Sequence, residues 1–415
     1  MRLAIVSQPF DGVLPPNQNS IGIWTNEVAR RLAARHDVTV YLQSNDTLKT
    51  KRDLDGVHYF PISLRPDDIL QRRWSPGPDA DPLVPAYARR RHWLGYALQV
   101  AWDLRRRGCD VAHVLNSHQF APTLKLFHPS LRVVLNMRCE WLSQLDRGLI
   151  GRHLRAVDRI VGCSTHVTGL IEARFPDFAD RCRTLPNAID TETFVPLSNR
   201  AEPPPVRLLF VGRVSPEKGV HVLIEAMKRV TQVRPDVRLD VVGGMSQLPG
   251  NYLVDISDDP LVSDLARFYG TETLGYSDLM KSGVEQAGLG HVIAFHGQLP
   301  YAEVVAHLQN ADLLINPSLS EAFGRGPVEA MACGTPVICA ATGGMTDTVD
   351  DGVTGLLTAP GNAEALAAAI LALLADPGRL AAMGFAGRRR AVELYSWDAV
   401  VRDLESIYTE MTDRD

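Results

Sequence analysis

No run of apolar residues in this sequence approaches the roughly 20 that a helix needs to cross a bilayer. Its six cysteines are scattered along 415 residues without forming a C-x-x-C pair, which argues against a zinc site and favours buried free thiols. The first residues lack the apolar core and cleavage pattern of a signal peptide, and no internal repeat or low-complexity tract is visible. These absences predict a globular protein in the cytoplasm, and the length predicts two domains.

Charge is distributed unevenly along the chain. Residues 1–190 carry 26 Lys and Arg against 19 Asp and Glu, a net charge of +7, and residues 191–415 carry 17 against 29, a net charge of −12. A basic half can attract an acceptor phosphate, a lipid headgroup or nucleic acid, although solvated helix faces are the simpler interpretation. The stretch Arg89–Trp93 is the candidate for peripheral contact with an anionic membrane. We expect no nucleic-acid partner, and the oligomeric state stays open.

Strand-like and helix-like segments alternate in the first half. The strand L-A-I-V-S is followed by a polar loop, a helix over 23–34 and the strand D-V-T-V-Y-L, which is a βαβ pattern. Further strands are predicted at V-A-H-V-L, R-V-V-L-N and R-I-V-G-C. Residues 61–85 contain six prolines, and we expect them to form a surface loop.

The pattern restarts after a proline-rich segment at 196–205, which we interpret as a linker. A helix is predicted over 220–230, and strands are predicted at V-R-L-L-F-V-G, V-R-L-D-V-V-G-G, H-V-I-A-F-H-G, A-D-L-L-I-N-P and T-P-V-I-C-A. Residues 246–283 form a polar, acidic insertion that is either a loop with its own role or a surface excursion. The tail from about 397 to 415 reads as an amphipathic helix with Ser396 as its N-cap.

These elements predict an α/β protein with two doubly wound, Rossmann-like domains. The first domain spans residues 1–195, and the tail helix is expected to pack back on it. The second spans residues 206–396.

Two acidic residues, Glu321 and Glu329, frame the stretch E-A-F-G-R-G-P-V-E directly after a predicted strand. The stretch reads as a turn followed by a helix N-terminus, where backbone amides can hold an anion. Ionised carboxylates only accept hydrogen bonds, so they can hold hydroxyl groups. A site that offers both suits a sugar attached to a diphosphate.

A second motif, G-R-V-S-P-E-K-G, begins at Gly212 and also follows a predicted strand. Arg213 and Lys218 flank a tight turn at the carboxyl end of that strand, where open α/β sheets bind ligands. The two cations would neutralise charge that develops on a leaving diphosphate. An ordinary surface turn is the alternative, and the nearby E-x7-E stretch weakens it.

Together these motifs resemble the family-four retaining glycosyltransferases, also called glycosyl transferases group 1, which have the GT-B fold. G-R-V-S-P-E-K-G is similar to the family's diphosphate-binding turn, and E-A-F-G-R-G-P-V-E-A-M-A-C-G-T-P-V-I is similar to its donor signature. L-P-N-A-I-D at 185–190 and A-T-G-G-M-T-D-T-V-D-D-G-V-T-G-L-L are similar to further family segments. The resemblance spans nearly the whole chain and implies two domains facing each other across a cleft.

The resemblance also implies roles for residues of the second domain. Arg213 and Lys218 would hold the donor diphosphate, Glu321 would contact hydroxyls of the transferred sugar, and Glu329 would bind the ribose. Other implied donor-binding residues are Gly212, Gln298, Leu299, Phe323, Gly324 and Arg325. The family usually has a small apolar residue at position 325, so Arg325 would add a charge suited to an unusual donor.

In the first domain the resemblance implies a glycine-containing loop after the first strand, where only Gly22 of the usual glycine pair remains. Gly22 would bind the donor by permitting close approach of the backbone to the donor phosphate, or to the acceptor. His118 matches a histidine that would lie beside the transferred sugar, with a purely structural histidine as the alternative. Together with Glu321, Arg213 and Lys218, it completes the expected catalytic set. Asn116, Arg138 and Glu140 stand where the family often contacts the acceptor.

We therefore predict a retaining glycosyltransferase that uses a nucleotide-diphosphate sugar, with UDP favoured and GDP next, and a hydroxyl on a small-molecule or lipid-linked acceptor. Neither a cofactor nor a metal is expected, because Arg213 and Lys218 would stabilise the diphosphate. The pairs Asp53/Asp55 and Asp79/Asp81 resemble metal-binding D-x-D motifs but lie in polar stretches, where solvated carboxylates are the better interpretation. The alternatives are a sugar phosphorylase, a nucleotide-sugar epimerase and a sugar-nucleotide-binding protein without transfer activity.

Overall fold

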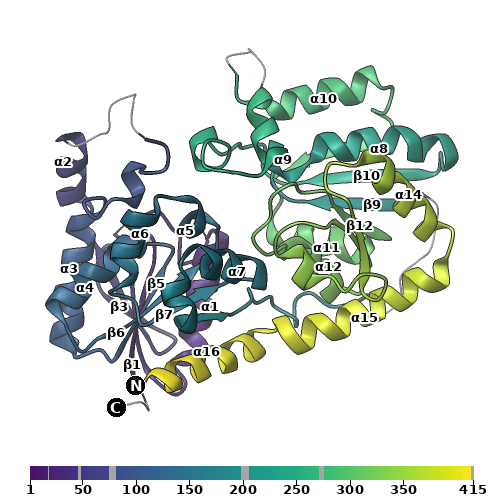
Figure 1. The fold of residues 1–415 in the computed structure, drawn as a ribbon. Helices are drawn as coiled ribbons and strands as arrows, with labels where there is room; N and C mark the ends of the chain where they lie inside the picture. Colours follow the sequence, from purple (N-terminus) through teal and green to yellow (C-terminus); the bar gives the residue numbers. More distant parts are fainter. Residues whose placement is uncertain (17, 45–47, 74–80, 198–204, 271–274, 413–415) are drawn as a thin grey trace. The chain divides into compact units, whose positions relative to one another are not determined.

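The computed structural model describes residues 1–415 except 17, 45–47, 74–80, 198–204, 271–274 and 413–415 (Figure 1). The chain divides into two compact units: unit 1 comprises Met1–Ala188 with Trp397–Asp415, and unit 2 comprises Ile189–Ser396. The division therefore precedes the proline-rich segment interpreted as the linker, and most of that segment lies outside the described residues.

Unit 1 contains an eight-stranded sheet with the order β3-β4-β2-β1-β5-β6-β7-β8. Its strands pair in parallel except β3 and β4, which are antiparallel. The strands are β1 (Arg2–Val6), β2 (Asp37–Gln43), β3 (Arg52–Leu54), β4 (Val57–Ile62), β5 (Val111–Leu115), β6 (Arg132–Met137), β7 (Arg159–Gly162) and β8 (Cys182–Thr184). All five predicted strands are present, whereas β3, β4 and β8 were not predicted.

Helices cover both faces of this sheet (Figure 1). They include α1 (Ser20–Leu32), α3 (Leu94–Arg107), α4 (Ala121–Phe127), α5 (Trp141–Gln144), α6 (Arg147–Leu154) and α7 (Thr165–Arg174). The tail forms α16 (Trp397–Thr412), whose residues Trp397, Val400, Leu404 and Tyr408 lie in one core cluster with Trp24 and Val28 of α1. Their spacing of three or four residues gives α16 one apolar face, which packs in unit 1.

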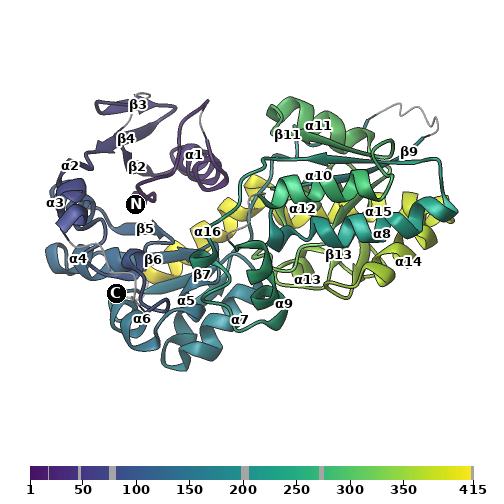
Figure 2. The same cartoon turned by 90° about the horizontal axis from the view of Figure 1, so that it is seen from above.

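The expectation of a loop over 61–85 was wrong for its first part. Strand β4 continues to Ile62, and α2 (Arg65–Arg73) follows it, between β4 and α3 (Figure 2). Pro61 is tolerated because β3 pairs only with Val57–Tyr59, so that side of β4 is a sheet edge at Pro61. Pro66 occupies the first turn of α2, where a missing backbone N–H costs nothing. Residues 74–80, including Asp79 of the second D-x-D pair, lie outside the described residues.

Unit 2 contains a six-stranded sheet with the order β11-β10-β9-β12-β13-β14, in which all paired strands are parallel. The strands are β9 (Val206–Val211), β10 (Val237–Val242), β11 (Ile293–Gly297), β12 (Leu313–Asn316), β13 (Val337–Ala340) and β14 (Gly355–Thr358). The five predicted strands are present. Taken from the first strand of the unit, this is the 3-2-1-4-5-6 order of a doubly wound fold.

Figure 1 shows α8 (Val220–Val233) and α10 (Tyr276–Gln286) on one side of these strands and α11 (Tyr301–Asn310) and α12 (Arg325–Ala332) on the other. The core on the first side also takes residues of α14 (Ala363–Leu374). Two shorter helices and one long helix complete the unit: α9 (Pro260–Ser263), α13 (Met345–Thr348) and α15 (Pro377–Tyr395).

The segment 246–283 is shorter as an insertion than predicted, because α10 already begins at Tyr276. Its described part contains α9 and two 3-10 turns, Gly250–Tyr252 and Asp264–Phe268. Val262 and Leu265 are buried, so these apolar positions anchor an otherwise polar segment.

Candidate functional site

The two sequence motifs of unit 2 come together where the strand order reverses. The turn 212–219 follows β9, and the turn 317–324 follows its neighbour β12. From β9 the chain continues to β10 on one side, whereas β12 lies on the other side, so the loops after these two strands diverge. Doubly wound sheets bind ligands in the crevice that this divergence leaves at the carboxyl ends of the strands.

The two turns touch through their backbones. A Cβ on Gly219 would lie 2.1 Å from the Pro317 carbonyl oxygen, so only glycine permits this approach. The Leu319 amide donates to the Glu217 carbonyl oxygen over 2.8 Å. The Lys218 Nζ atom then lies 2.7 Å from Oε2 of Glu321. Residues 103 positions apart thus form one cation–carboxylate pair.

Glu321 is held as a carboxylate. Burial alone would raise its pKa, but attraction to Lys218 and hydrogen bonds from the amides of Gly324 and Phe323 outweigh burial, so the pKa lies below its usual value. An ionised carboxylate next to an ammonium group can accept hydrogen bonds from sugar hydroxyls, while the ammonium group faces the same crevice as a compact charge.

A second pair in this turn involves Glu217, which sequence reasoning did not select. Its Oε1 atom accepts hydrogen bonds from Arg213 Nη2 at 3.0 Å and from Ser215 Oγ at 2.7 Å. Glu217 is buried, and Arg213 is partly exposed. The Glu217 carboxylate therefore orients the Arg213 side chain. In the sequence, an acidic residue inside an otherwise basic turn was the signal for this role.

Two glycines of the block A-T-G-G-M hold the Glu321 turn. A Cβ on Gly343 would lie 1.9 Å from the Glu321 carbonyl oxygen, and one on Gly344 would lie 2.3 Å from the Ala322 carbonyl oxygen. The Gly344 amide donates to the Glu321 carbonyl over 2.9 Å. The loop after β13 therefore lies directly on the backbone that presents Glu321 and Phe323.

Helix α12 begins at Arg325 after Gly324, whose φ of 91° is left-handed. Arg325 Nε lies 2.6 Å from Oε1 of Glu329, one helical turn along. The charge of Arg325 is thus balanced within the site. Burial raises the pKa of Glu329, although Arg325 opposes this.

The remaining donor-site candidates of unit 2 lie at the same end of its sheet. Gln298 and Leu299 directly follow β11, and Gln298 lies beside Gly244, which follows β10. The Gly212 amide donates to the Val242 carbonyl oxygen over 2.9 Å. The carboxyl ends of β9, β10 and β11 are therefore held together around these residues.

Unit 1 repeats this arrangement between β1 and β5, where its strand order reverses. His118 begins a 3-10 turn, His118–Phe120, three residues after the end of β5. Its Nδ1 atom lies 2.9 Å from Nδ1 of His153 in α6, and the rings stack with centroids 5.1 Å apart. Burial, and then His153, lower the pKa of His118 to about 3, so its imidazole is neutral at pH 7. His153 was not identified from the sequence, because it lies on another element.

Two of the three acceptor candidates, Asn116 and Arg138, are in direct contact. Asn116 has a positive φ of 52° and accepts a hydrogen bond from the Arg138 amide over 2.7 Å, so these two are brought together. The Arg138 guanidinium contacts the Asn187 side chain and lies 4.0 Å from the centroid of the Trp24 ring. Glu140 instead pairs with His166 at 2.9 Å.

Gly22 has a packing role in this structure. A Cβ at this position would lie 1.6 Å from the Gly12 carbonyl oxygen. The close approach that glycine permits is therefore between α1 and the loop after β1 of the same unit.

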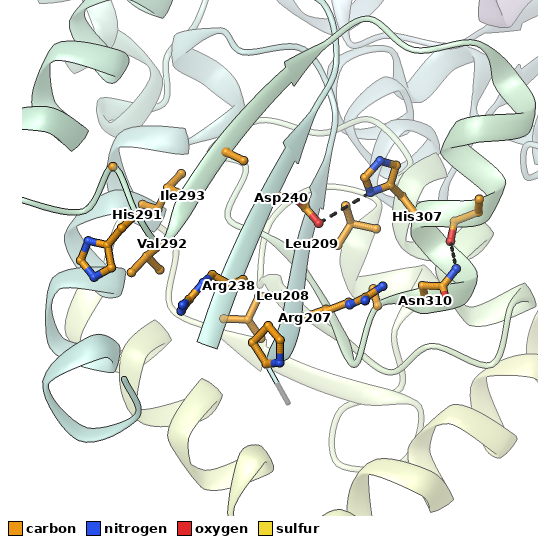
Figure 3. A pocket seen from close by; sticks show the side chains of 15 residues that line it. Arg207, Leu208, Leu209, Arg238, Asp240, His291, Val292, Ile293, His307 and Asn310 are labelled. Atoms are coloured by element: carbon orange, nitrogen blue, oxygen red, sulfur yellow. Dashed lines mark hydrogen bonds and ion pairs between the residues drawn. The ribbon is translucent and has the colours of Figure 1, made fainter. Parts of the chain in front are cut away.

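A cavity of about 410 Å³ lies elsewhere in unit 2, near the amino ends of β9, β10 and β11 and beside α11 (Figure 3). Figure 3 shows Arg207 and Arg238 directed away from each other and Asp240 paired with His307, 3.7 Å away. Asp240 also pairs with His296 at 2.6 Å. Arg238 also donates to the carbonyl oxygens of Pro235 and Val237. The cavity is at the opposite end of the strands from the motif turns and offers no convergent set of charges.

The described residues contain no group of three or more His, Cys, Asp or Glu placed to hold a metal ion. Within the same residues no single helix is long and apolar enough to cross a membrane. Helices α14 and α15 reach the required length and apolar composition only when they are counted together, and the two are bent relative to each other.

Two doubly wound α/β units, one of them carrying cations and carboxylates at its switch point, are typical of the GT-B class of proteins. Family models extend this to the family: residues 21–193 match Glycosyltransferase Family 4, and residues 197–390 match Glycosyl transferases group 1. The chain belongs among the family-four-like glycosyltransferases with the GT-B fold.

Individual relatives agree with this assignment. The chain is 27% identical to a D-inositol 3-phosphate glycosyltransferase from Thermobispora bispora over 99% of this chain and 94% of that protein. It is 28% identical to a glycogen synthase from Mycobacterium tuberculosis over 65% of this chain, and that match spans only 59% of the relative.

Solved structures share the fold at low identity. A sucrose-phosphate synthase from Thermosynechococcus elongatus superposes with a TM-score of 0.73 at 19% identity, covering 100% of both chains. HepE from Anabaena in complex with UDP superposes with a TM-score of 0.72 at 18% identity, covering 99% of this chain and 100% of that one. At these identities the likeness concerns the fold.

Proposed function

We propose that this protein is a retaining glycosyltransferase that transfers a sugar from a nucleotide-diphosphate sugar to a hydroxyl acceptor. The observation that carries the proposal is the pair of Lys218 and Glu321, 2.7 Å apart at the switch point of unit 2. The pair supports the proposal because a cation able to neutralise a leaving diphosphate lies beside a carboxylate able to accept hydrogen bonds from sugar hydroxyls.

The donor is proposed to be a UDP-sugar, with a GDP-sugar next. HepE structures hold UDP and UDP-glucose, which supports UDP for a chain of the same fold. Arg213 and Lys218 would bind the diphosphate, Glu321 the transferred sugar and Glu329 the ribose. The Arg325 amide would contact the sugar and phosphate, whereas the amides of Phe323 and Gly324 donate to the Glu321 carboxylate and would orient it towards the sugar.

In the proposed reaction the bond between the sugar and the diphosphate breaks while the acceptor oxygen bonds to the same carbon on the same face. The hydroxyl proton passes to the departing diphosphate. Arg213 and Lys218 would balance the charge that develops on the leaving group, so the reaction as proposed requires no divalent metal. Neutral His118 of unit 1 would form a hydrogen bond with the transferred sugar.

The acceptor is proposed to bind unit 1 and to be a small molecule or a lipid-linked hydroxyl compound. Residues 1–190 carry a net charge of +7, which favours an anionic acceptor. One relative is named for an inositol 3-phosphate substrate, an acceptor of that chemical type. Asn116, Arg138 and Glu140 are the proposed contacts.

Lys218→Ala tests this proposal. Calorimetric titration without metal should show that UDP binding weakens at least about 100-fold, with a similar loss in release of UDP from UDP-glucose. Lys228→Ala is the matched control, because Lys228 pairs with exposed Glu225 at 2.7 Å on α8 and should behave like the unsubstituted protein. Unchanged UDP binding in Lys218→Ala, or no diphosphate bound by the unsubstituted protein, would contradict the proposal.

A further inference from the structure

Arg325 and Glu329 form a buried ion pair that the sequence did not anticipate. Arg325 Nε lies 2.6 Å from Oε1 of Glu329, and the exposed fractions of the two side chains are 25% and 8%. The Tyr301 hydroxyl is a further neighbour of the same guanidinium. These residues come from the first two turns of α12 and the start of α11, so the pair is built on rigid elements.

The pair leaves hydrogen-bonding groups available. Among the described residues, the Oε2 atom of Glu329 accepts no hydrogen bond and is not among the fully enclosed polar atoms. Arg325 uses its Nε atom for Glu329, and a guanidinium carries four further N–H donors on its two terminal nitrogens. One accessible acceptor and several donors therefore lie side by side.

Stability alone gives a weak reason for this pair. Removing two charges from water costs about as much as a buried ion pair returns, and apolar replacements are often neutral or stabilising. A ligand that uses both charges explains the arginine better.

A ribose diol has the matching chemistry. Each hydroxyl group is one donor and two acceptor lone pairs. A carboxylate alone can satisfy only the donors, whereas a carboxylate with an adjacent guanidinium satisfies both roles. Hydrogen bonds to charged groups are also stronger than those between neutral groups.

We propose that Arg325 binds the ribose of the donor nucleotide together with Glu329. Its guanidinium donates hydrogen bonds to the hydroxyl oxygens, and the carboxylate accepts hydrogen bonds from the same hydroxyl groups. This inference rests on the proposed function, because it needs a nucleotide at this site. It makes Arg325 a residue that sets the preference for ribonucleotides over 2′-deoxyribonucleotides.

The test is calorimetric titration with UDP, 2′-deoxy-UDP, GDP and 2′-deoxy-GDP, without metal, on the unsubstituted protein, Arg325→Leu and Arg325→Lys. We expect the unsubstituted protein to bind its preferred ribonucleotide about 10- to 100-fold more tightly than the 2′-deoxy form. Arg325→Leu should reduce that ratio about tenfold. Arg325→Lys keeps the charge but lacks the planar guanidinium group. Its ratio should therefore lie between those of the unsubstituted protein and Arg325→Leu.

The outcomes separate the two claims. An unchanged ratio in Arg325→Leu, even with weaker binding overall, would mean that Arg325 only supports the structure. Tighter ribonucleotide binding in Arg325→Leu would mean that Arg325 competes with the ribose for Glu329, and would also overturn the inference. Failure of the unsubstituted protein to bind any of the four nucleotides would overturn the proposed function itself. Circular dichroism establishes folding of each variant, and Arg325→Lys serves as the test if Arg325→Leu does not fold.

Discussion

The two units place their candidate residues at equivalent positions but equip them differently. In unit 2 the turns after β9 and β12 carry ion pairs, Lys218 with Glu321 at 2.7 Å and Arg213 with Glu217 at 3.0 Å. In unit 1 the turn after β5 carries a pair of buried imidazoles, His118 and His153, whose pKa values are lowered to about 3 and about 4. Charged groups suit a diphosphate, and neutral donors and acceptors suit hydroxyl groups.

The difference can be measured because the units differ in their chromophores. All six tryptophans fall within the sequence ranges of unit 1. Tryptophan fluorescence therefore reports unfolding of unit 1 alone, whereas nucleotide binding is expected to report the integrity of unit 2.

The largest effect is expected from glycines that bring backbones together. Gly343→Ala would place a Cβ 1.9 Å from the Glu321 carbonyl oxygen at a φ of 53°. We expect a loss of about 3 kcal/mol of stability in unit 2 and no measurable UDP binding, with an unchanged tryptophan transition. Gly22→Ala would place a Cβ 1.6 Å from the Gly12 carbonyl oxygen. It should lower the stability of unit 1, seen in the tryptophan transition, and leave UDP binding unchanged.

Gly352→Ala is the control for that experiment. Gly352 has a φ of 78° but open space around a Cβ, so it isolates the backbone cost of about 1 kcal/mol. If Gly343→Ala behaves like Gly352→Ala, the contact with the Glu321 turn does not hold the site.

A smaller effect is expected from lowering the pH, which should reduce the stability of unit 1. Burial lowers the pKa of His113 and His118 to about 3. A histidine with a lowered folded-state pKa stabilises the fold fully above its unfolded pKa of about 6.5 and loses that contribution as the pH falls towards the folded-state value. Between pH 7 and pH 5 each should cost about 2 kcal/mol.

Urea titration followed by tryptophan fluorescence measures this loss. The midpoint should fall from pH 7 to pH 5, and less so in His118→Phe, because that variant lacks one titrating group. In unit 2 burial lowers the pKa of His221 comparably, to about 4. An unfolding midpoint that does not change over this range would show that the imidazoles of unit 1 are not held neutral by the fold.

The smallest effect is expected at the D-x-D pair of unit 1. Asp53 pairs with His58 at 2.6 Å and Asp55 with Arg30 at 3.0 Å, and both carboxylates are exposed. The double variant Asp53→Asn/Asp55→Asn should retain full UDP release from UDP-glucose, with or without a chelator. A loss of activity that manganese restores would contradict both the metal-independent proposal and the interpretation of these residues as solvated carboxylates.

Much of the fold could be predicted because its signals are local. All ten strands expected from apolar runs are present, and the tail forms α16, whose buried residues recur with helical spacing. The elements that were missed are short or atypical. Strand β4 contains Pro61, which is acceptable only because that side of the strand lacks a partner.

The candidate site was recognisable in part for the same reason. Gly212, Lys218, Glu321 and Glu329 lie in motifs with fixed spacing, so a pattern of neighbouring residues indicates them. Glu217 and His153 were missed, because their importance comes from contacts with Arg213 and with His118. Arg325 was noticed as an added charge, but only its distance to Glu329 shows that this charge is balanced.

The sequence by itself therefore determined the alternation of strands and helices, the two turns that follow β9 and β12, and the family to which they point. Hydrophobic periodicity and glycine-rich turns act over a few residues, so they can be seen without a fold. Only the tertiary structure decided that Lys218 meets Glu321 across 103 positions, that Gly343 supports the Glu321 turn and that His118 shares a hydrogen bond with His153. Those contacts depend on strand order and on packing between distant segments, which local patterns do not encode.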